Sequence, residues 1–588
     1  MKRKYLFIML LFSIMFLATS KKLLANANEF TYKEVTAVPG DTSTELQKLL
    51  NYNKNGKYIL VINIPEGDYL LNKELRIYSN TSIRADKNAL LLKNHQRGAM
   101  LANDLTNDKG GYETTKNISI SGGIWDSSRI ASLNKGTESL RFIHATDVII
   151  KSATIRNVPD GSHLITFAGV KNGTVKNCLL YGYGGSMLKE AIQLDIVHDK
   201  VIVPSMQEKY LVYDDLACDN ILITGSEIYD YSRAIGSHTS VRGVFHKNIT
   251  IHNNKLHDLQ DTAIKAYNYR NLIVSNNTIY NVNMGILVYT YIKNEDKHYL
   301  EPLETTIKEP MPDNYNIVIK NNTIYNIDET ISTQGASWGD AIHTIGSSGR
   351  PLSGVSIYSN TIKNIQRCGI FLEGTTQSDI TNNSINNTNN SGIYLIAGSH
   401  HAKITYNTLY KAGLLVQNTG GISLYQSNKA TIIYNSLTYS GKNGISLYNE
   451  SNYGKIDNNT IEYTGENAIA LYNQSNHTLV TSNKIKNYGL NGIFAYQTQS
   501  ASIKTNKIYG KKTGKSNDSI HIIGDNTHKS AFIIYRNYSN HSKRNAIYVA
   551  KAPKTYISKN VLLNYVKTAI YLGEGSLNSK LNSNKIHT

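Results

Sequence analysis

One short pattern recurs along most of this chain and limits what it can fold into. Asparagine, one variable residue and then Ile, Leu or Val recur with the asparagines at 254, 277, 322, 360, 383, 407, 435, 459, 483, 506, 560 and 584. Where nothing is inserted, the step is 23 or 24 residues, and a Gly/Ala-Ile pair follows about ten residues after each asparagine. A period of this length is typical of solenoids, in which each repeat packs only against its neighbours.

The residues inside each repeat indicate strands and turns. Short runs rich in Ile, Leu, Val and Tyr alternate with Asn, Gly and Ser, and helical periodicity is almost absent. Leucine-rich repeats share the period but need a Leu-x-x-Leu-x-Leu frame that this chain lacks. The sequence therefore predicts an all-β, right-handed parallel β-helix whose coils stack about 4.8 Å apart. We expect the repeated asparagines to occupy left-handed turns and to form a ladder of side-chain amides.

The N-terminal region indicates that the chain is exported and that a cap precedes the β-helix. Residues 1–4 are basic, residues 5–18 form an apolar run, and Ala25-Asn26-Ala27 fits a signal-peptide cleavage site. The run is shorter than the roughly 20 residues of a membrane span. We predict a signal peptide over residues 1–27, a cap and first coils over 28–120, and the β-helix over 121–588. Coils 155–345 should carry a groove and coils 353–588 should be regular, with a short capping helix within residues 39–50 that begins at Asp41 or Thr42.

Net charge limits the kinds of molecule that this chain is expected to bind, and cysteine content limits how its fold can be cross-linked. The formal net charge is +18, and five of these charges lie in the first 27 residues. A basic surface favours polyanions, and export makes nucleic acid an unlikely partner, so we expect a secreted monomer that binds an acidic polysaccharide or cell-envelope glycan. Three cysteines are too few for a disulfide scaffold.

Two columns of outward-facing side chains should cross the first coils. Side chains alternate along a strand, so the residues one and three places after each inward Ile should face solvent. Insertions at 196–217, 290–313 and 346–352 follow the same strand and should wall a groove beside these columns. Carboxylates, an imidazole and an ammonium in such a groove can act as acid, base and charge neutraliser. The predicted catalytic residues are Asp160, Glu190, Asp195, His238 and Lys265, and the predicted substrate-binding residues are His163, Gln193, Arg233, Tyr267, Tyr289 and His343.

Ordinary structural roles compete with these predictions. Asp160 lies in Pro-Asp-Gly, a turn sequence, Glu190 can pair with Lys189, and Lys265 can be an exposed lysine. A tyrosine ladder in the regular coils also has two possible roles. Its rings can stack on sugar faces or only on one another. Its members are Tyr425, Tyr448, Tyr472 and Tyr496.

Several motifs resemble a known superfamily. Gly40-Asp41 with Glu45-Leu46-Gln47, then Ile-Pro-x-Gly-x-Tyr at 64–69, Gly-Gly-x-x-Asp at 122–126 and the Asn-x-Ile coils are similar to the pectin-lyase-like superfamily of secreted polysaccharide hydrolases, lyases and epimerases. The resemblance covers about residues 37–588 and implies a right-handed parallel β-helix. It is specific for the fold rather than for one reaction.

A narrower resemblance points to polygalacturonases. The order Asp160, Glu190 and Asp195, Gly236-Ser-His238 and Ile264-Lys265 resembles that family's Asn-Thr-Asp, Asp-Asp, Gly-His-Gly and Arg-Ile-Lys motifs. It implies glycosidic hydrolysis by the three carboxylates, with His238 supporting them and Lys265 holding a substrate carboxylate.

Two other functions stay open. The first is uronate elimination or C5-epimerisation, with His238, Lys265 or Tyr267 as the base. The second is a non-catalytic, glycan-binding or adhesive β-solenoid. We predict no cofactor and no metal ligand: Ca²⁺ stays an open alternative, but no tight run of acidic residues is present to hold it.

Overall fold

The computed structural model describes residues 31–128, 138–290, 299–331, 339–346, 349–415, 419–511, 517–525, 527 and 530–587. The predicted signal peptide (residues 1–27) lies outside the described residues. No helix in the described ranges is long and apolar enough to cross a membrane.

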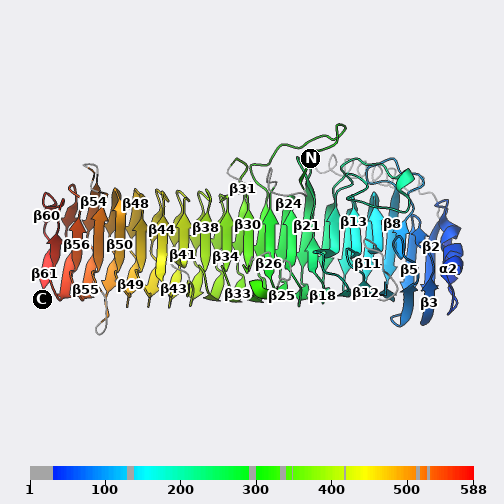
Figure 1. Cartoon of the computed structure of the whole chain (residues 1–588), viewed down its shortest axis with the longest axis horizontal. Coiled ribbons are helices and arrows are strands. Elements are labelled where there is room, and N and C mark those ends of the chain that lie inside the picture. The colour runs from blue at the N-terminus through cyan, green and yellow to red at the C-terminus, as the bar shows by residue number, and fades with distance from the viewer. Residues whose placement is uncertain are drawn as a thin grey trace, which may run out of the picture.

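The described chain forms a long stack of coils, each made of three short strands (Figure 1). One regular coil contains β41 (Gly420–Tyr425), β42 (Thr431–Ile433) and β43 (Ser436–Thr438). Each strand pairs in parallel with its equivalent in the next coil, which begins with β44 (Asn443–Tyr448). Three parallel sheets result, and parallel strands connected in this way have right-handed crossovers. The predicted all-β parallel β-helix is confirmed.

The inward isoleucines fix the register of the coils. Ile422 pairs with Ile445, and Ile445 pairs with Ile469. All three are fully buried in one continuous core that runs through the stack. Because side chains alternate along a strand, this register also decides which residues face outward.

A short helix closes the N-terminal end of the stack (Figure 1). Helix α2 spans Ser43–Leu50 and begins after Thr42. The Thr42 side chain accepts a hydrogen bond from the backbone of Thr44, and Glu45 completes a capping box. Leu46 and Leu50 bury the apolar side of α2 against the first coils. The predicted capping helix is confirmed, with Thr42 as its N-cap.

The asparagine ladder also forms, with one correction. The backbone amide and the Nδ2 group of Asn407 both donate to Oδ1 of Asn435. The same two groups of Asn435 donate in turn to Oδ1 of Asn459. The expected left-handed conformation falls one residue earlier, at Tyr406 and Tyr434. The ladder asparagines therefore have ordinary backbone angles, and their amides hydrogen-bond to the neighbouring coils instead of shaping the turn.

Removing one ladder amide should destabilise the stack measurably. Asn435→Ala leaves the buried donors of Asn407 without their acceptor, and an orphaned buried group costs about 1–3 kcal/mol. We expect a lower free energy of unfolding by denaturant titration. Asn94, an exposed asparagine outside the ladder, is the control, and Asn94→Ala should change stability by about 0.5 kcal/mol at most. Equal effects of the two substitutions would contradict a structural role for the ladder.

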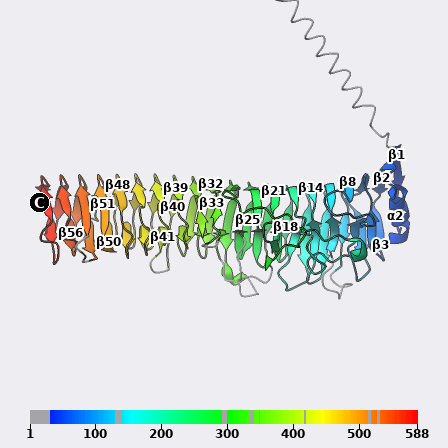
Figure 2. The ribbon, with the colours of Figure 1, turned by 90° about the horizontal axis from the view of Figure 1, so that it is seen from above.

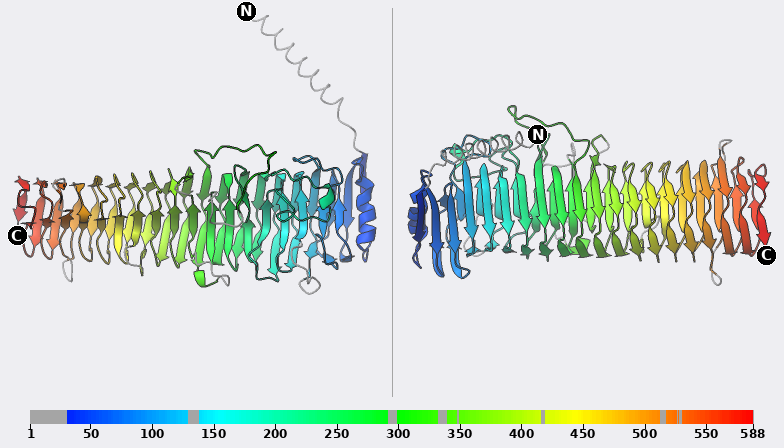
Figure 3. Two further views of the ribbon diagram at one scale, coloured as in Figure 1. Left: turned by 45° about the horizontal axis from the view of Figure 1, so that its top comes forward. Right: turned by 180° about the vertical axis from the view of Figure 1, so that it is seen from behind.

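Long connections rise from one side of the first coils. The loop over residues 196–217 leaves β16 (Glu190–Asp195), and the segment around β27 (Tyr299–Leu300) arches over the next coils on the same side (Figures 1 and 3). The two connections touch, since Asp215 accepts hydrogen bonds from Leu303 and Thr306. Figure 2 shows the same stack from above as a nearly straight rod. The prediction that insertions project from one rim is confirmed for these two segments.

Candidate functional site

Residues in or beside four neighbouring strands, together with one loop, line a small cavity, which we call the covered cavity. The strands are β10 (Glu138–Ile143), β13 (His163–Ala168), β16 and β19 (Arg233–Gly236), which pair in that order in one sheet. Residues 201–204 of the loop lie over it. The cavity has a volume of about 140 Å³, and it is lined by Glu138, Arg141, Gly161, His163, Thr166, Lys189, Gln193, Asp195, Val201, Ile202, Val203, Pro204 and His238.

The loop over the cavity is firmly attached. Val203 and Leu211 pack into a small apolar cluster with Leu105 and Ile143 of the coils below. The Arg141 guanidinium donates to the carbonyl oxygen of Pro204. The loop therefore forms a roof over the cavity that is held to the coils below.

A buried ion triad holds the far end of the roof. His144 Nδ1 contacts the Asp108 carboxylate at 2.9 Å, and Nε2 contacts Asp214 of the loop at 3.0 Å. Burial alone would lower the pKa of His144, but the hydrogen bonds to the two carboxylates outweigh it and raise the pKa to about 9. The pKa values of both carboxyl groups are lowered, since their hydrogen bonds and the His144 charge outweigh burial. The imidazolium therefore bridges the loop to the coils at neutral pH.

The triad predicts a pH window for roof attachment. A raised folded-state pKa gives His144 a stabilising contribution that is full below its unfolded pKa near 6.5 and is lost as pH rises through about 9. The lowered carboxyl pKa values give stability that is lost as pH falls below about 4. Limited proteolysis should cut the loop faster above pH 9 than at pH 7.

A matched variant separates this triad from histidine pairing in general. His144→Gln should make the loop susceptible already at pH 7. His257 also lies between two carboxylates, Glu227 and Asp258, but far along the surface from the loop. His257→Gln should leave the proteolysis pattern unchanged, and equal cleavage in both variants would count against the triad as the anchor.

The carboxyl group of Asp195 lies inside the covered cavity. Its side chain is 3% exposed, and burial raises its pKa to about 7. Gln193 Nε2 donates to Asp195 Oδ2 at 2.8 Å. Within the described residues, Asp195 Oδ1, Gln193 Oε1 and Thr166 Oγ1 are buried and have no hydrogen-bond partner. Buried polar groups normally have partners, so these three oxygens suit a ligand that brings its own hydrogen-bond donors.

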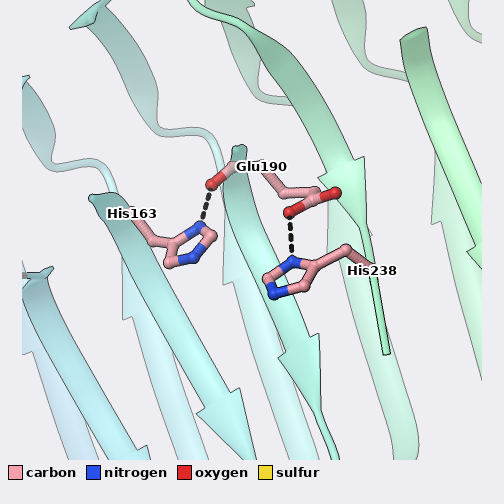
Figure 4. A group of neighbouring side chains, drawn as sticks. All are labelled: His163, Glu190 and His238. Atoms are coloured by element: carbon pink, nitrogen blue, oxygen red, sulfur yellow. Dashed lines mark hydrogen bonds and ion pairs between the residues drawn. The ribbon is translucent and has the colours of Figure 1, made fainter. Parts of the chain in front are cut away.

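A second group of polar side chains holds an imidazole at the cavity wall. His238 Nδ1 lies 3.0 Å from Glu190 Oε2 (Figure 4). Arg233 bridges Glu190 to Asp261. Burial opposes ionisation of Glu190, but His238 and Arg233 hold its pKa well below the usual value. An ionised carboxylate only accepts hydrogen bonds, so Nδ1 of His238 carries the proton.

This arrangement prepares His238 to act as a base. Burial lowers the pKa of His238 below its ordinary value despite the nearby Glu190 carboxylate. The neutral ring with a proton on Nδ1 has its lone pair on Nε2, on the side away from Glu190 (Figure 4). Glu190 therefore positions His238 and sets its tautomer.

His163 has the same tautomer. Its Nδ1 donates to the backbone oxygen of Glu190 at 2.6 Å, and its ring lies parallel to that of His238 with centroids 5.9 Å apart. Burial lowers the pKa of His163 to about 3, so this ring stays neutral at physiological pH.

His163, Glu190 and His238 are close enough together to be considered as metal ligands. Two imidazoles and one carboxylate suit Zn²⁺ better than Ca²⁺, which prefers oxygen ligands. However, the Glu190 carboxylate already binds Arg233 and His238, and Nδ1 of each histidine already has an oxygen partner. The group therefore fits an oriented base better than a metal centre, and the prediction of a metal-free site remains untested.

The structure does not form the single exposed stripe expected from the sequence. Asp195 and Gln193 are buried, and Lys265, Tyr267, Tyr289 and His343 do not line the cavity. The Lys265 ammonium lies 5.9 Å from the ring centres of Tyr267 and Tyr289, although its charge still contributes to lowering the pKa of His238. Of the coils 155–345 that were expected to carry a groove, those up to His238 contribute to the covered cavity.

Two other predicted residues have internal partners. Asp160 Oδ1 accepts hydrogen bonds from the Tyr183 hydroxyl and from the backbone amides of Ser186 and Met187. These bonds give Asp160 a structural role at its turn. His343 is buried beside Asp340 and packs on the ring of Phe371. Asp160 and Glu190 are not among the residues that line the cavity. The three-carboxylate arrangement implied by the polygalacturonase resemblance therefore does not face it.

Glycine at 236 explains why His238 leaves its expected column. A Cβ atom at Gly236 would lie 2.1 Å from the carbonyl oxygen of Lys265, so only glycine fits. Strand β19 ends there, and Ser237 hydrogen-bonds back to Lys265. The chain then turns His238 toward Glu190 instead of continuing the ladder.

Four cavity residues with polar side chains were not predicted from the sequence: Glu138, Arg141, Thr166 and Lys189. Arg141 pairs with Thr166, and Thr166 pairs with Gln193, so both continue the column that contains Gln193 toward the N-terminus. Extending that column by two coils would have found them. Lys189 was noted only as a partner for Glu190.

The tyrosine ladder forms in register but is not one continuous stack. Tyr425 pairs with Tyr448, and Tyr472 pairs with Tyr496. The rings of Tyr448 and Tyr472 stack 4.9 Å apart and 2° from parallel. Asn443 and Asn467 donate to their hydroxyl oxygens, so these two rings have structural partners. A polar groove of about 460 Å³ is lined by Gln426, Asn449, Glu450, Asn473, Gln474, Gln497 and Asp525.

Family models match parts of the chain. A model described as a right-handed β-helix region matches residues 215–353 and 344–421. A model described as the periplasmic copper-binding protein NosD matches residues 410–538. A search of curated proteins finds no significant match.

Two solved structures are among those to which this chain is similar. The surface protein and adhesin PfbA of Streptococcus pneumoniae is 20% identical with a TM-score of 0.51, covering 67% of this chain and 100% of that chain. A family 28 exopolygalacturonase of Yersinia enterocolitica is 12% identical with a TM-score of 0.39, covering 64% and 79%. The chain has a right-handed parallel β-helix, the fold that the sequence resemblance implied. At such identities the likeness concerns the fold and not the activity.

The segment that matches NosD offers little for copper. Copper sites use histidine, cysteine or methionine ligands, and the described residues of this segment contain His477 and His521 only. His477 packs on Tyr453, and His521 is held by Asp518. The candidate metal-ligand group found among the described residues lies elsewhere, at His163, Glu190 and His238. These residues do not fit a copper site in the matched segment.

Proposed function

We propose that this protein is an exported enzyme that acts on a uronate-containing polysaccharide in the covered cavity by removing the proton at C5 of a uronate. The observation that carries the proposal is the pairing of two groups at one cavity. His238 is a neutral imidazole whose Nδ1 proton is fixed by ionised Glu190, and Asp195 is a buried carboxyl with a raised pKa. Pairs of groups whose pKa values are pushed apart are typical of acid–base catalysis.

The proposed chemistry assigns each group one task. His238 Nε2 takes the C5 proton, and the electron pair of the C5–H bond moves toward the substrate carboxylate. Asp195 in its protonated form and the Lys189 ammonium hydrogen-bond that carboxylate and stabilise the added charge. Breakage of the C4–O4 bond, with the proton passed to O4, gives elimination, whereas return of a proton to the opposite face of C5 gives epimerisation.

Hydrolysis by two carboxylates has less support. It needs an acid and a base that both face the scissile bond. Asp160 is bound in its turn, and Glu190 lies behind His238. Two carboxyl groups line the cavity, those of Asp195 and Glu138, and Glu138 is paired with Arg141.

A panel of acidic polysaccharides tests the reaction. Polygalacturonate, polymannuronate and polyguluronate would be incubated with the protein while reducing ends and the ultraviolet absorbance of an unsaturated product are followed. We expect either new absorbance with new reducing ends, or a change in the uronate epimer composition with neither. New reducing ends without absorbance would indicate hydrolysis and contradict the proposal.

A second function, glycan binding by the regular coils, is supported by the polar groove beside the tyrosine ladder. Side-chain amides repeat along it at one per coil, and Asn473 donates to Asn449. Amides in a row can hydrogen-bond successive hydroxyl groups of a sugar chain. If binding is the whole function, the double variant Asp195→Ala/His238→Ala should bind polysaccharide as well as the unchanged protein, and neither should turn it over.

A further inference from the structure

A second and larger hollow lies between the helical cap and the roof of the covered cavity, and we call it the N-terminal cleft. It has a volume of about 770 Å³. Gln47 and Asn51 at the end of α2, Arg76 and Tyr78 of the first coil, and Met206 of the loop contribute to its walls. A hollow of this size is in the range that binds small ligands or a stretch of a polymer.

The cleft is strongly cationic. Lys54, Lys73, Arg76 and Arg97 line it, and none of these four forms an ion pair within the described residues. Its one carboxyl group, that of Glu74, accepts a hydrogen bond from the Ala99 amide, and burial raises its pKa. The four cations of the walls therefore outnumber this single carboxyl group, and the excess of positive charge favours an anionic ligand.

The uncharged walls suit a sugar chain rather than a bare anion. The side chains of Gln47, Asn51, Asn72 and Gln96 add amide donors and acceptors to the lining. Amides can bond the hydroxyl groups of a sugar while the cations bond its carboxylates. The Tyr78 ring adds an apolar surface, although most of that ring is buried.

The cleft adjoins the covered cavity through one short segment. Residues 201–204 cover the cavity, and Met206 lines the cleft. Two residues of chain span at most about 7 Å, so the linings of the two hollows come within about that distance of each other at this segment. Gly98 shows how closely the loop approaches: a Cβ atom there would lie 2.7 Å from Met206 Cγ and 2.6 Å from Glu74 Oε2.

We propose that the N-terminal cleft binds the continuation of an acidic polysaccharide whose reacting uronate lies in the covered cavity. The substrate class rests on the function proposed above. The four cations would hold successive carboxylates, and the polymer would run from the cavity past Met206 toward the helical cap. The cleft would then favour polymers over short oligosaccharides without taking part in the chemistry.

Charge-removing variants test the cleft. The triple variant Lys73→Gln/Arg76→Gln/Arg97→Gln removes three positive charges and leaves every cavity residue in place. Loss of one exposed cation weakens an ionic contact by about two- to fivefold, so we expect about a tenfold or greater rise in the Kd for polygalacturonate, measured calorimetrically in the His238→Ala background. Binding by the unaltered cleft should weaken with added salt, and dextran, a neutral polymer, should not bind.

A matched control removes the same charge elsewhere. Lys363→Gln/Lys484→Gln/Lys507→Gln changes three exposed lysines of the regular coils. This variant should leave the Kd unchanged, and thermal unfolding of each variant reports whether it is folded. If the cleft triple variant is unstable, Arg97→Gln alone, at an exposed position, should still weaken binding.

The outcomes separate this inference from the proposed reaction. Unchanged polymer binding and an unchanged KM in the cleft variant would overturn the inference even if the enzyme acts on uronates. Equal binding of dextran would overturn it as well. Salt-sensitive binding that the cleft variant loses, without any turnover of polygalacturonate, polymannuronate or polyguluronate, would support the cleft and contradict the reaction.

Discussion

Replacing His238 by alanine should lower turnover of the acidic polysaccharide by about 10²–10⁴-fold, since this is the usual contribution of a positioned acid or base. The KM should change little, because the carboxylate and hydroxyl contacts are assigned to other residues. Added imidazole should restore part of the lost rate by entering the space that the ring leaves. His252→Ala, at a histidine on another face of the stack that contacts Ser275, is the control and should keep full activity.

A related prediction concerns Glu190, whose carboxylate is hydrogen-bonded to His238. Glu190→Gln keeps the size of the side chain but removes the charge that holds the Nδ1 proton. We expect a large loss of kcat together with a changed pH profile, since the tautomer and the pKa of His238 are no longer set by a carboxylate. A variant that only lost stability would not shift the pH profile.

Replacing Asp195 by alanine should lower kcat by about 10²–10³-fold, the usual cost of removing one hydrogen-bond donor that stabilises developing charge. Its pKa of about 7 makes the rate of the unchanged enzyme fall as pH rises above 7. The lowered pKa of His238 keeps the base available below pH 6.5. The optimum should therefore be mildly acidic. Asp195→Asn, which cannot ionise, should retain more activity than the alanine variant and should lose the decline above pH 7.

The same carboxyl group links activity to stability. Its folded-state pKa is raised above the unfolded value near 3.9, so the protonated form is favoured by folding. That contribution is full below about pH 4 and is lost as pH rises through 7. Asp195→Asn should consequently raise the Tm at pH 8 and change it little at pH 4. The opposite pH dependence would show that Asp195 is not buried as described.

Much of the fold could be predicted from local patterns. Each inward Ile is followed by a turn and by an amide that bonds the next coil, so residues such as Ile422 and Ile445 align without any non-local information. The helical cap was predictable for a similar reason, because Thr42 and Glu45 form a capping box within four residues. The columns that pair Gln193 with Gly236 and Gly236 with Lys265 were predicted correctly.

The covered cavity could be predicted only in part. We derived the columns on the assumption that every strand continues three residues past its Ile. Strand β19, however, ends at Gly236, and His238 turns aside. We also assumed that outward residues are exposed. Asp195 is buried because the loop folds back over it, and that depends on contacts such as His144 with Asp214, 70 residues apart in the sequence. No repeat pattern records such a contact.

The most direct test of the account is to follow the C5 proton of the uronate units by NMR while the protein acts on polygalacturonate, polymannuronate or polyguluronate in D₂O. Elimination and epimerisation both remove this proton. We predict that the C5 proton signal is lost with the unchanged protein and persists with His238→Ala. A signal that persists while the chains are shortened, or that is lost equally fast without His238, would contradict the assignment of proton abstraction to the covered cavity.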